Sequence, residues 1–126
     1  MLDRTDIDVQ VLGVGPDGHL GFNEPGDTLC DSAHKEVLDE STIDANQRFF
    51  ASRDDVPRYA LTMGMGNILR AKKLLMIVSG HKEDAMRRLL LSERIDPHCP
   101  ATFLRLHRDA VVLLERSLAY AIGYKA

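Results

Sequence analysis

The chain of 126 residues lacks the features that mark several large classes of protein. It has no tryptophan and only two cysteines, Cys30 and Cys99, which are far apart and form no metal-spaced pair. A disulfide framework is therefore not expected, and a reducing cytoplasm is the expected compartment. The five histidines show no H-x-x-x-H spacing, so we predict that no metal is bound.

Charge and hydropathy exclude further classes. Sixteen basic against nineteen acidic residues leave a net charge of −3, which gives no electrostatic case for binding nucleic acid or an anionic membrane. No apolar run approaches the roughly 20 residues that a membrane span requires. The polar N-terminus, residues 1–6, has no signal-peptide pattern. The length suits a single domain over residues 1–126.

What the sequence does contain is an alternation of apolar strands and amphipathic helices. Strands are predicted over 7–14, 35–38, 58–62, 74–78 and 110–114. Helices are predicted over 41–50, 67–72, 81–91 and 117–124, whereas 101–106 is ambiguous. Ser41 is the expected N-cap of the first helix. The order predicts an α/β fold with a mainly parallel sheet flanked by helices, in which the apolar run 74–78 is buried on both faces.

The segment richest in glycine and polar groups follows the first strand, and reads Leu12-Gly-Val-Gly-Pro-Asp-Gly-His-Leu-Gly-Phe-Asn-Glu-Pro-Gly26. Its first three spaced glycines match the dinucleotide-binding pattern G-x-G-x-x-G in form. That pattern requires a helix to begin among the glycines, so that the helix N-terminus meets the pyrophosphate. The residues that follow, with further glycine and proline, would break such a helix. A nucleotide site is therefore not expected.

This loop contains three acid–base groups, Asp17, His19 and Glu24, within a span of eight residues. A histidine flanked by two carboxylates can transfer protons, because one carboxylate holds the ring tautomer and stabilises the imidazolium. The competing interpretation is that the glycines only form turns and that the polar groups are solvated. The residues alone do not decide between the two.

Two cations are candidate ligands for an anion. Lys82 follows the strand 74–78 at the start of a predicted helix, and helix N-termini favour anions. Arg48 lies between polar residues and two aromatics and can clamp a phosphate. Taken singly, a solvated lysine and an exposed helix arginine are the more common interpretations.

Together these segments resemble the glucosamine-6-phosphate deaminase family. The likeness covers 12–26, Ala45-Asn-Gln-Arg-Phe-Phe50, Val56-Pro-Arg-Tyr-Ala-Leu-Thr-Met-Gly-Met-Gly66, Leu74-Leu-Met-Ile-Val-Ser-Gly-His-Lys82 and Pro100-Ala-Thr-Phe-Leu-Arg-Leu-His107. It implies a Rossmann-like fold of the NagB type and a small sugar phosphate as substrate. The implied reaction converts glucosamine 6-phosphate and water to fructose 6-phosphate and ammonia, in amino-sugar catabolism, without a cofactor.

The resemblance also implies roles for the candidate residues. His19 would be the acid/base group that opens the sugar ring, with Asp17 and Glu24 as its carboxylate partners. Arg48 and Lys82 would bind the substrate phosphate.

The matched segments correspond to the C-terminal part of the family's chain. The N-terminal strands, a phosphate-binding Gly/Thr loop and the aspartate that abstracts the C2 proton are then expected to be missing, and strands such as 74–78 would be left as exposed edges. Allosteric members place a serine and an arginine where this chain has Asp27 and His34. An acid there would repel a phosphate, so activation by N-acetylglucosamine 6-phosphate is not expected.

Other functions remain open at this point. 6-Phosphogluconolactonase shares the fold and a Gly-x-Asp-Gly-His segment, although Phe22-Asn-Glu-Pro25 favours the deaminase because it supplies the second carboxylate. Galactosamine-6-phosphate deaminase is hardly separable from the glucosamine enzyme. The short N-terminus supports a non-catalytic, truncated fragment that binds a sugar phosphate. The sequence leaves the oligomeric state open, a homo-oligomer included.

Overall fold

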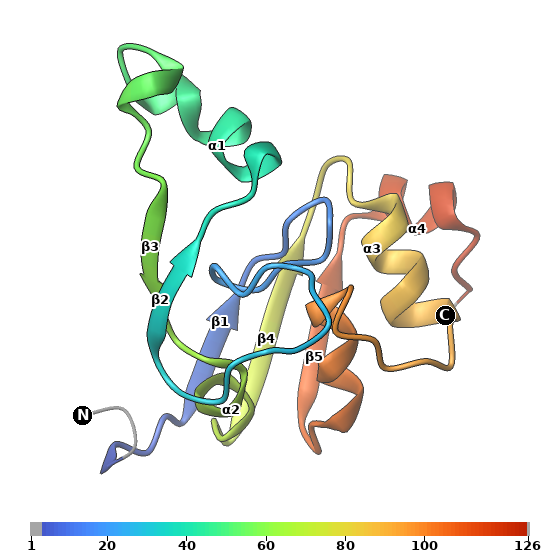
Figure 1. The fold of residues 1–126 in the computed structure, drawn as a ribbon. Helices are drawn as coiled ribbons and strands as arrows, with labels where there is room; N and C mark the ends of the chain where they lie inside the picture. Colours follow the sequence, from blue (N-terminus) through green and yellow to red (C-terminus); the bar gives the residue numbers. More distant parts are fainter. Residues whose placement is uncertain (1–3, 126) are drawn as a thin grey trace.

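The computed structural model describes residues 4–125, and its framework is a three-stranded parallel sheet (Figure 1). The strands lie in the order β1 (Val9–Leu12), β4 (Lys73–Val78) and β5 (Ala110–Leu114). Helical segments connect them, which confirms the predicted α/β fold with a mainly parallel sheet. The ends of the expected 1–126 domain, and the first residues of the polar N-terminus, lie outside the described residues.

Helical segments cover one face of this sheet. They are α2 (Met65–Leu69), α3 (Glu83–Met86) with a π-helical continuation (Arg87–Leu91), a 3-10 helix (Pro100–Leu106) and α4 (Arg116–Ile122). The three predicted helices of this region are confirmed to within a few residues, and the ambiguous segment 101–106 is the 3-10 helix. We call this sheet, its helices and the loops that join them the body. Within residues 4–125, no helix is both long enough and apolar enough to cross a bilayer.

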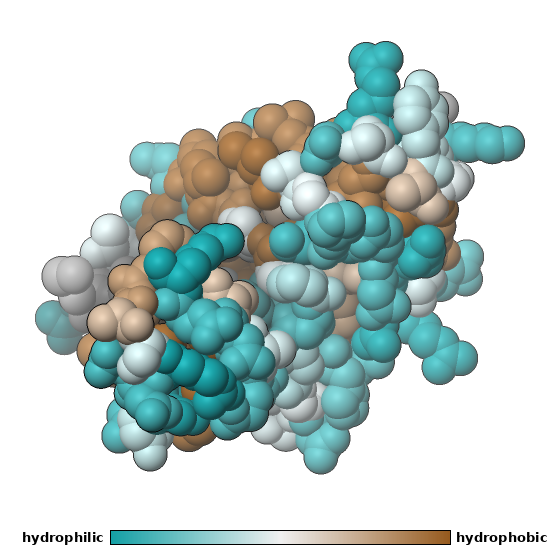
Figure 2. All heavy atoms as spheres, turned by 90° about the horizontal axis from the view of Figure 1, so that it is seen from above, coloured by the Kyte–Doolittle hydropathy of each residue, from teal (hydrophilic) through white to brown (hydrophobic). Residues whose placement is uncertain are grey.

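The two faces of the sheet differ in burial. On the face under the helices, Leu74, Met76 and Val78 are at most 3% exposed and belong to the main hydrophobic core. On the opposite face, Val11 is 58% and Ile77 is 53% exposed. Seen from above in Figure 2, apolar side chains gather in a continuous brown area along one side of the molecule. The side chains of β4 are therefore buried on one face only, and the expectation of burial on both is wrong.

The position of β4 also differs from the expectation of an exposed edge. Because β1 pairs along one side of β4 and β5 along the other, β4 is the central strand and the edges are β1 and β5. What is exposed at β4 is a face and not an edge.

A second, smaller unit projects from the body (Figure 1). It is an antiparallel pair, β2 (His34–Val37) with β3 (Tyr59–Thr62), whose connection contains α1 (Glu40–Asn46) and two 3-10 turns (Gln47–Phe49 and Arg53–Asp55). We call residues 34–62 the arm. Its helix begins after Asp39, so the prediction of Ser41 as N-cap is wrong. The predicted helix 41–50 also ends early, because a 3-10 turn follows α1.

Candidate active site

The loop after β1 runs from residue 13 to residue 33 without a helix, so the helix that a dinucleotide site requires is not formed. Two of its glycines determine its path. A β-carbon at Gly15 would overlap the ring of His19, which therefore lies directly against the backbone. Gly18 has a φ of 89°, a left-handed conformation that favours glycine, and a β-carbon there would meet Sγ of the buried Cys99. Substitution of either glycine would displace the loop.

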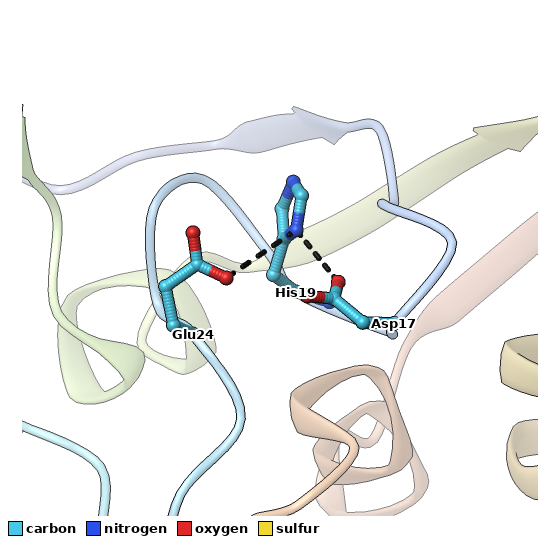
Figure 3. A group of neighbouring side chains, drawn as sticks. All are labelled: Asp17, His19 and Glu24. Atoms are coloured by element: carbon cyan, nitrogen blue, oxygen red, sulfur yellow. Dashed lines mark hydrogen bonds and ion pairs between the residues drawn. The ribbon is translucent and has the colours of Figure 1, made fainter. Parts of the chain in front are cut away.

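Asp17, His19 and Glu24 converge in this loop (Figure 3). Nδ1 of His19 lies 2.7 Å from Oδ1 of Asp17 and 3.7 Å from Oε2 of Glu24. The backbone N–H of His19 donates to the same Asp17 oxygen at 3.1 Å. An ionised Asp17 only accepts hydrogen bonds, so Nδ1 carries a proton and Nε2 is the nitrogen that can exchange one. Figure 3 shows Nε2 pointing away from both carboxylates. We call these three residues the relay.

Glu24 is the buried member of the relay, with a side chain that is 5% exposed. Its Oε1 accepts a hydrogen bond of 2.7 Å from the hydroxyl of Thr42, which belongs to α1. Its Oε2 has no hydrogen-bond partner among the described residues and lies on the side of His19. Next to it, the amide of Asn23 donates to the carbonyls of Leu20 and Met63 and ties the loop down. A buried carboxylate oxygen is thus held beside an imidazole.

The relay shifts the pKa of each of its members. For Asp17, burial acts to raise the pKa, but the hydrogen bonds from His19 outweigh it and the pKa is lowered. For His19, burial acts to lower the pKa, but Asp17 first, then the charges of Glu24 and Asp39, raise it above 6.5. For Glu24, burial is the main cause of a raised pKa, which the hydroxyl of Thr42 and His19 oppose. The relay therefore favours an ionised Asp17 beside a histidine that charges readily.

The relay opens into a cleft of about 270 Å³ at the carboxyl ends of β1 and β4, the place where parallel α/β sheets bind ligands. Body and arm both line it, with Val14, Gly15, Pro16, Asp17, His19 and Lys82 from the body and Ser41, Thr42, Ala45, Asn46 and Arg48 from the arm. Arg48 stands in the 3-10 turn after α1, with its guanidinium 4.7 Å from the centre of the Phe49 ring. Lys82 immediately precedes α3.

The structure thus brings the five predicted site residues to one place. Four of them line the cleft, and Glu24 stands beside His19 with its carboxylate buried. Sequence reasoning missed Thr42. Its contact with Glu24 joins residues 18 positions apart and depends on how the arm packs. The one available signal was a small polar residue beside the apolar Ile43 in a predicted helix.

The relay is also a group that could hold a metal, since one ligand atom from each member lies within 4.8 Å of the others. The 2.7 Å contact between Nδ1 and Asp17 is a hydrogen-bond distance, and a metal at Nδ1 would have to replace its proton. The prediction that no metal is bound stays a prediction.

Asp27 and His34, the positions considered for an activator phosphate, contact other residues. The ring of His34 forms hydrogen bonds with the carbonyl of Ser32 and with the carboxylate of Glu36. Asp27 lies 2.9 Å from Nε2 of His98. That no activator phosphate binds here stays a prediction.

Known proteins similar to this chain are about twice as long. A glucosamine-6-phosphate deaminase of Clostridium perfringens is 47% identical over 117 residues, which are 93% of this chain and 48% of that protein. One of Lacticaseibacillus paracasei is 47% identical over 120 residues, 94% of this chain and 50% of that protein. The chain therefore spans about half the length of the curated relatives it matches. No protein-family model matches it.

Solved structures agree with these relatives. A monomeric glucosamine-6-phosphate deaminase, described as a missing link of the NagB superfamily, has a TM-score of 0.84 and 44% identity over 94% of this chain and 48% of that chain. A 6-phosphogluconolactonase of Trypanosoma cruzi has a TM-score of 0.68 at 16% identity over 91% of this chain and 41% of that chain. The lactonase shares the fold alone. The predicted fold of the NagB type is confirmed.

Proposed function

We propose that this chain, which belongs to the glucosamine-6-phosphate deaminase family and corresponds to its C-terminal half, supplies the ring-opening and phosphate-binding part of a deaminase site. The reaction converts glucosamine 6-phosphate and water to fructose 6-phosphate and ammonia. The observation that supports this most is the meeting of the relay with Arg48 and Lys82 on one cleft. Opening the ring of a sugar phosphate requires a group that transfers protons, and binding its phosphate is favoured by cations such as these two.

In this proposal the relay acts on the cyclic form of the sugar. Opening the ring breaks the bond between C1 and the ring oxygen, so the ring oxygen gains a proton and the C1 hydroxyl gives one up. Nε2 of His19 exchanges these protons, because Asp17 occupies Nδ1. The raised pKa of His19 increases the share of imidazolium that can act as the acid at neutral pH. The buried carboxylate of Glu24 stabilises that charge from a second side.

The substrate phosphate lies between Arg48 and Lys82 in this proposal. The two cations come from different units of the chain, so the phosphate also joins the arm to the body. Arginine binds phosphate through two parallel N–H donors, and lysine acts as a compact point charge. Binding of this non-reacting group holds the sugar at Nε2 of His19, which makes ring opening a unimolecular step.

A second candidate function is binding of a sugar phosphate without turnover by the chain on its own. It is favoured by the span of about half of the relatives' length. The likeness to lactonases is one of fold and gives no support to lactone hydrolysis. We also propose the cytoplasm as the compartment of this protein, as the sequence leads us to expect, and a sugar-phosphate substrate is consistent with it.

Calorimetric titration with fructose 6-phosphate tests the site. We expect Lys82→Ala and Arg48→Ala each to weaken binding at least tenfold, since each removes a charge-assisted contact. Lys72→Ala is the matched control, because this exposed lysine pairs with Asp8 away from the cleft. Unchanged affinity in both site variants would show that the phosphate does not bind in this cleft.

Ammonia release from glucosamine 6-phosphate, measured with and without the remaining half of a relative, separates the two candidate functions. Release that His19→Gln abolishes supports the deaminase. Binding without release in either mixture leaves the second candidate. The same assay with galactosamine 6-phosphate distinguishes the two amino sugars.

A further inference from the structure

The face of the sheet opposite the helices is apolar and uncovered by the described residues. Its apolar side chains are Val9, Val11, Leu75, Ile77, Val111 and Leu113, which we call the open face, and Lys73 lies at its border beside Val9. The strand register aligns Val11, Leu75 and Val111 in one row across the sheet, and Ile77 with Leu113 in the next. Five of the six are between 39% and 58% exposed. Contiguous apolar side chains of this kind mark a surface that another polypeptide covers.

The extent of exposed surface agrees with this interpretation. The chain exposes 7896 Å², whereas a compact monomer of 14.1 kDa is expected to expose roughly 6,700 Å². The excess of roughly 1,200 Å² exceeds the approximately 800 Å² that one partner buries in an interface of standard size. The open face contributes part of this excess, and exposed side chains of the projecting arm contribute another part.

The open face also adjoins the cleft. Val11 precedes Gly13 by two positions, and a β-carbon at Gly13 would meet no atom within 4 Å. The chain then continues through Val14 and Gly15 into the cleft wall. In addition, β1 is an edge strand of the described sheet, and its free side can pair with a further parallel strand. A partner on this face and edge would reach the carboxyl end of β1, where the relay lies.

We propose that the open face and the edge of β1 dock a polypeptide equivalent to the half of a glucosamine-6-phosphate deaminase that this chain does not span. The relatives carry about as much chain again beyond the matched part. A second copy of this chain would repeat the matched half and would supply none of the part of the relatives that lies outside the match. The docked half would complete the sheet and close the cleft. The docking thus rests on the proposed function and extends it.

Co-expression of the 126-residue chain with the unmatched half of the Clostridium perfringens deaminase tests this docking. We expect a one-to-one complex by size-exclusion chromatography with light scattering. Val11→Lys and Ile77→Lys should each weaken the complex at least tenfold, because each buries an unpaired ammonium in the interface. Leu61→Lys is the matched control, since Leu61 is an apolar strand residue of the arm that is 83% exposed, and it should leave affinity within twofold. Circular dichroism of each purified variant verifies that it is folded.

The outcomes separate docking from catalysis because the complex is measured without substrate. A complex that Val11→Lys dissolves supports docking, and if that complex releases no ammonia, only the proposed activity is overturned. Absence of a complex with wild-type chain overturns the docking proposal. So does a homodimer of this chain that Val11→Lys dissolves, because the open face would then serve self-association. Equal loss of affinity in Leu61→Lys would overturn it as well.

Discussion

The body and the arm bury very different amounts of apolar surface. The body has a core of sixteen buried residues that extends from β1 to α4. The arm has three, Leu38, Ile43 and Val56, with Phe22 and Ala60 packed against them. A small core supplies little stability of its own, so the arm depends on its contacts with the loop after β1. The candidate site lies where the two units meet.

This difference divides the site into a fixed part and a dependent part. The relay, with Lys82, belongs to the body, whereas Arg48 and Thr42 belong to the arm. One hydrogen bond, from Thr42 to Glu24, joins the relay directly to the arm. Changes in the body core should therefore affect the whole chain, and changes in the arm should affect the cleft first.

The largest effect is expected from Met76→Ala. Met76 is fully buried at the centre of β4, and its truncation leaves a cavity that the packed body cannot close. The free energy of unfolding should fall by about 2–5 kcal/mol. Urea denaturation followed by circular dichroism measures it. A loss below about 0.5 kcal/mol would contradict a rigid body core.

Ile43→Ala makes the opposite test, because Ile43 is just as buried but belongs to the arm. We expect amide exchange in α1 and β3 to accelerate at least tenfold while that of β4 changes little, since arm contacts open locally. Hydrogen exchange with mass spectrometry measures both. Equal acceleration throughout the chain would show that arm and body unfold as one unit.

Thr42→Val should have an intermediate effect, because it leaves the buried carboxylate of Glu24 without its hydroxyl donor. We expect a loss of about 1–3 kcal/mol at pH 7, the cost of an unsatisfied buried polar group. It should also raise the pKa of Glu24 further, since the hydroxyl now opposes that rise. Thr42→Ser keeps the donor and is the control. Thermal unfolding measures the loss of stability, and carboxyl NMR measures the pKa of Glu24. Identical behaviour of the two variants would show that the hydroxyl of Thr42 does not stabilise the carboxylate of Glu24.

The smallest effect expected is a pH dependence that His19 imposes on stability. Its folded-state pKa is raised above 6.5, so its stabilising contribution is complete below pH 6.5 and is lost as pH rises through the folded pKa. For Asp17, whose pKa is lowered from 3.8, the contribution is complete above 3.8 and is lost in more acidic solution. Unfolding titrations from pH 5.5 to 9 should show the first decline in wild type and not in His19→Gln. NMR titration of Asp17→Asn should place the pKa of His19 lower than in wild type. A curve of His19→Gln that declines as wild type does would assign the dependence to another group.

Much of the fold followed from local pattern. The apolar run 110–114 matches β5 in both bounds, and 74–78 lies within β4, because short apolar segments bounded by polar residues have few other stable structures. Burial was harder to predict. A run of apolar residues is the same whether one face of its strand is covered or two, so the open face could not be read from 74–78. Likewise, the two-stranded arm depends on pairing between 34–37 and 59–62, which local pattern does not reveal.

The sequence by itself determined which groups carry chemistry. It placed Asp17, His19 and Glu24 in one glycine-rich loop, where their short separation already brings a carboxylate to an imidazole. Tertiary structure decided what those groups experience. Burial and the hydroxyl of Thr42 set the state of Glu24, and packing of the arm on the body brought Arg48 and Lys82 to the same cleft from positions 34 residues apart. Local spacing fixes contacts within a loop, whereas contacts between distant segments exist only once a core has formed to hold them.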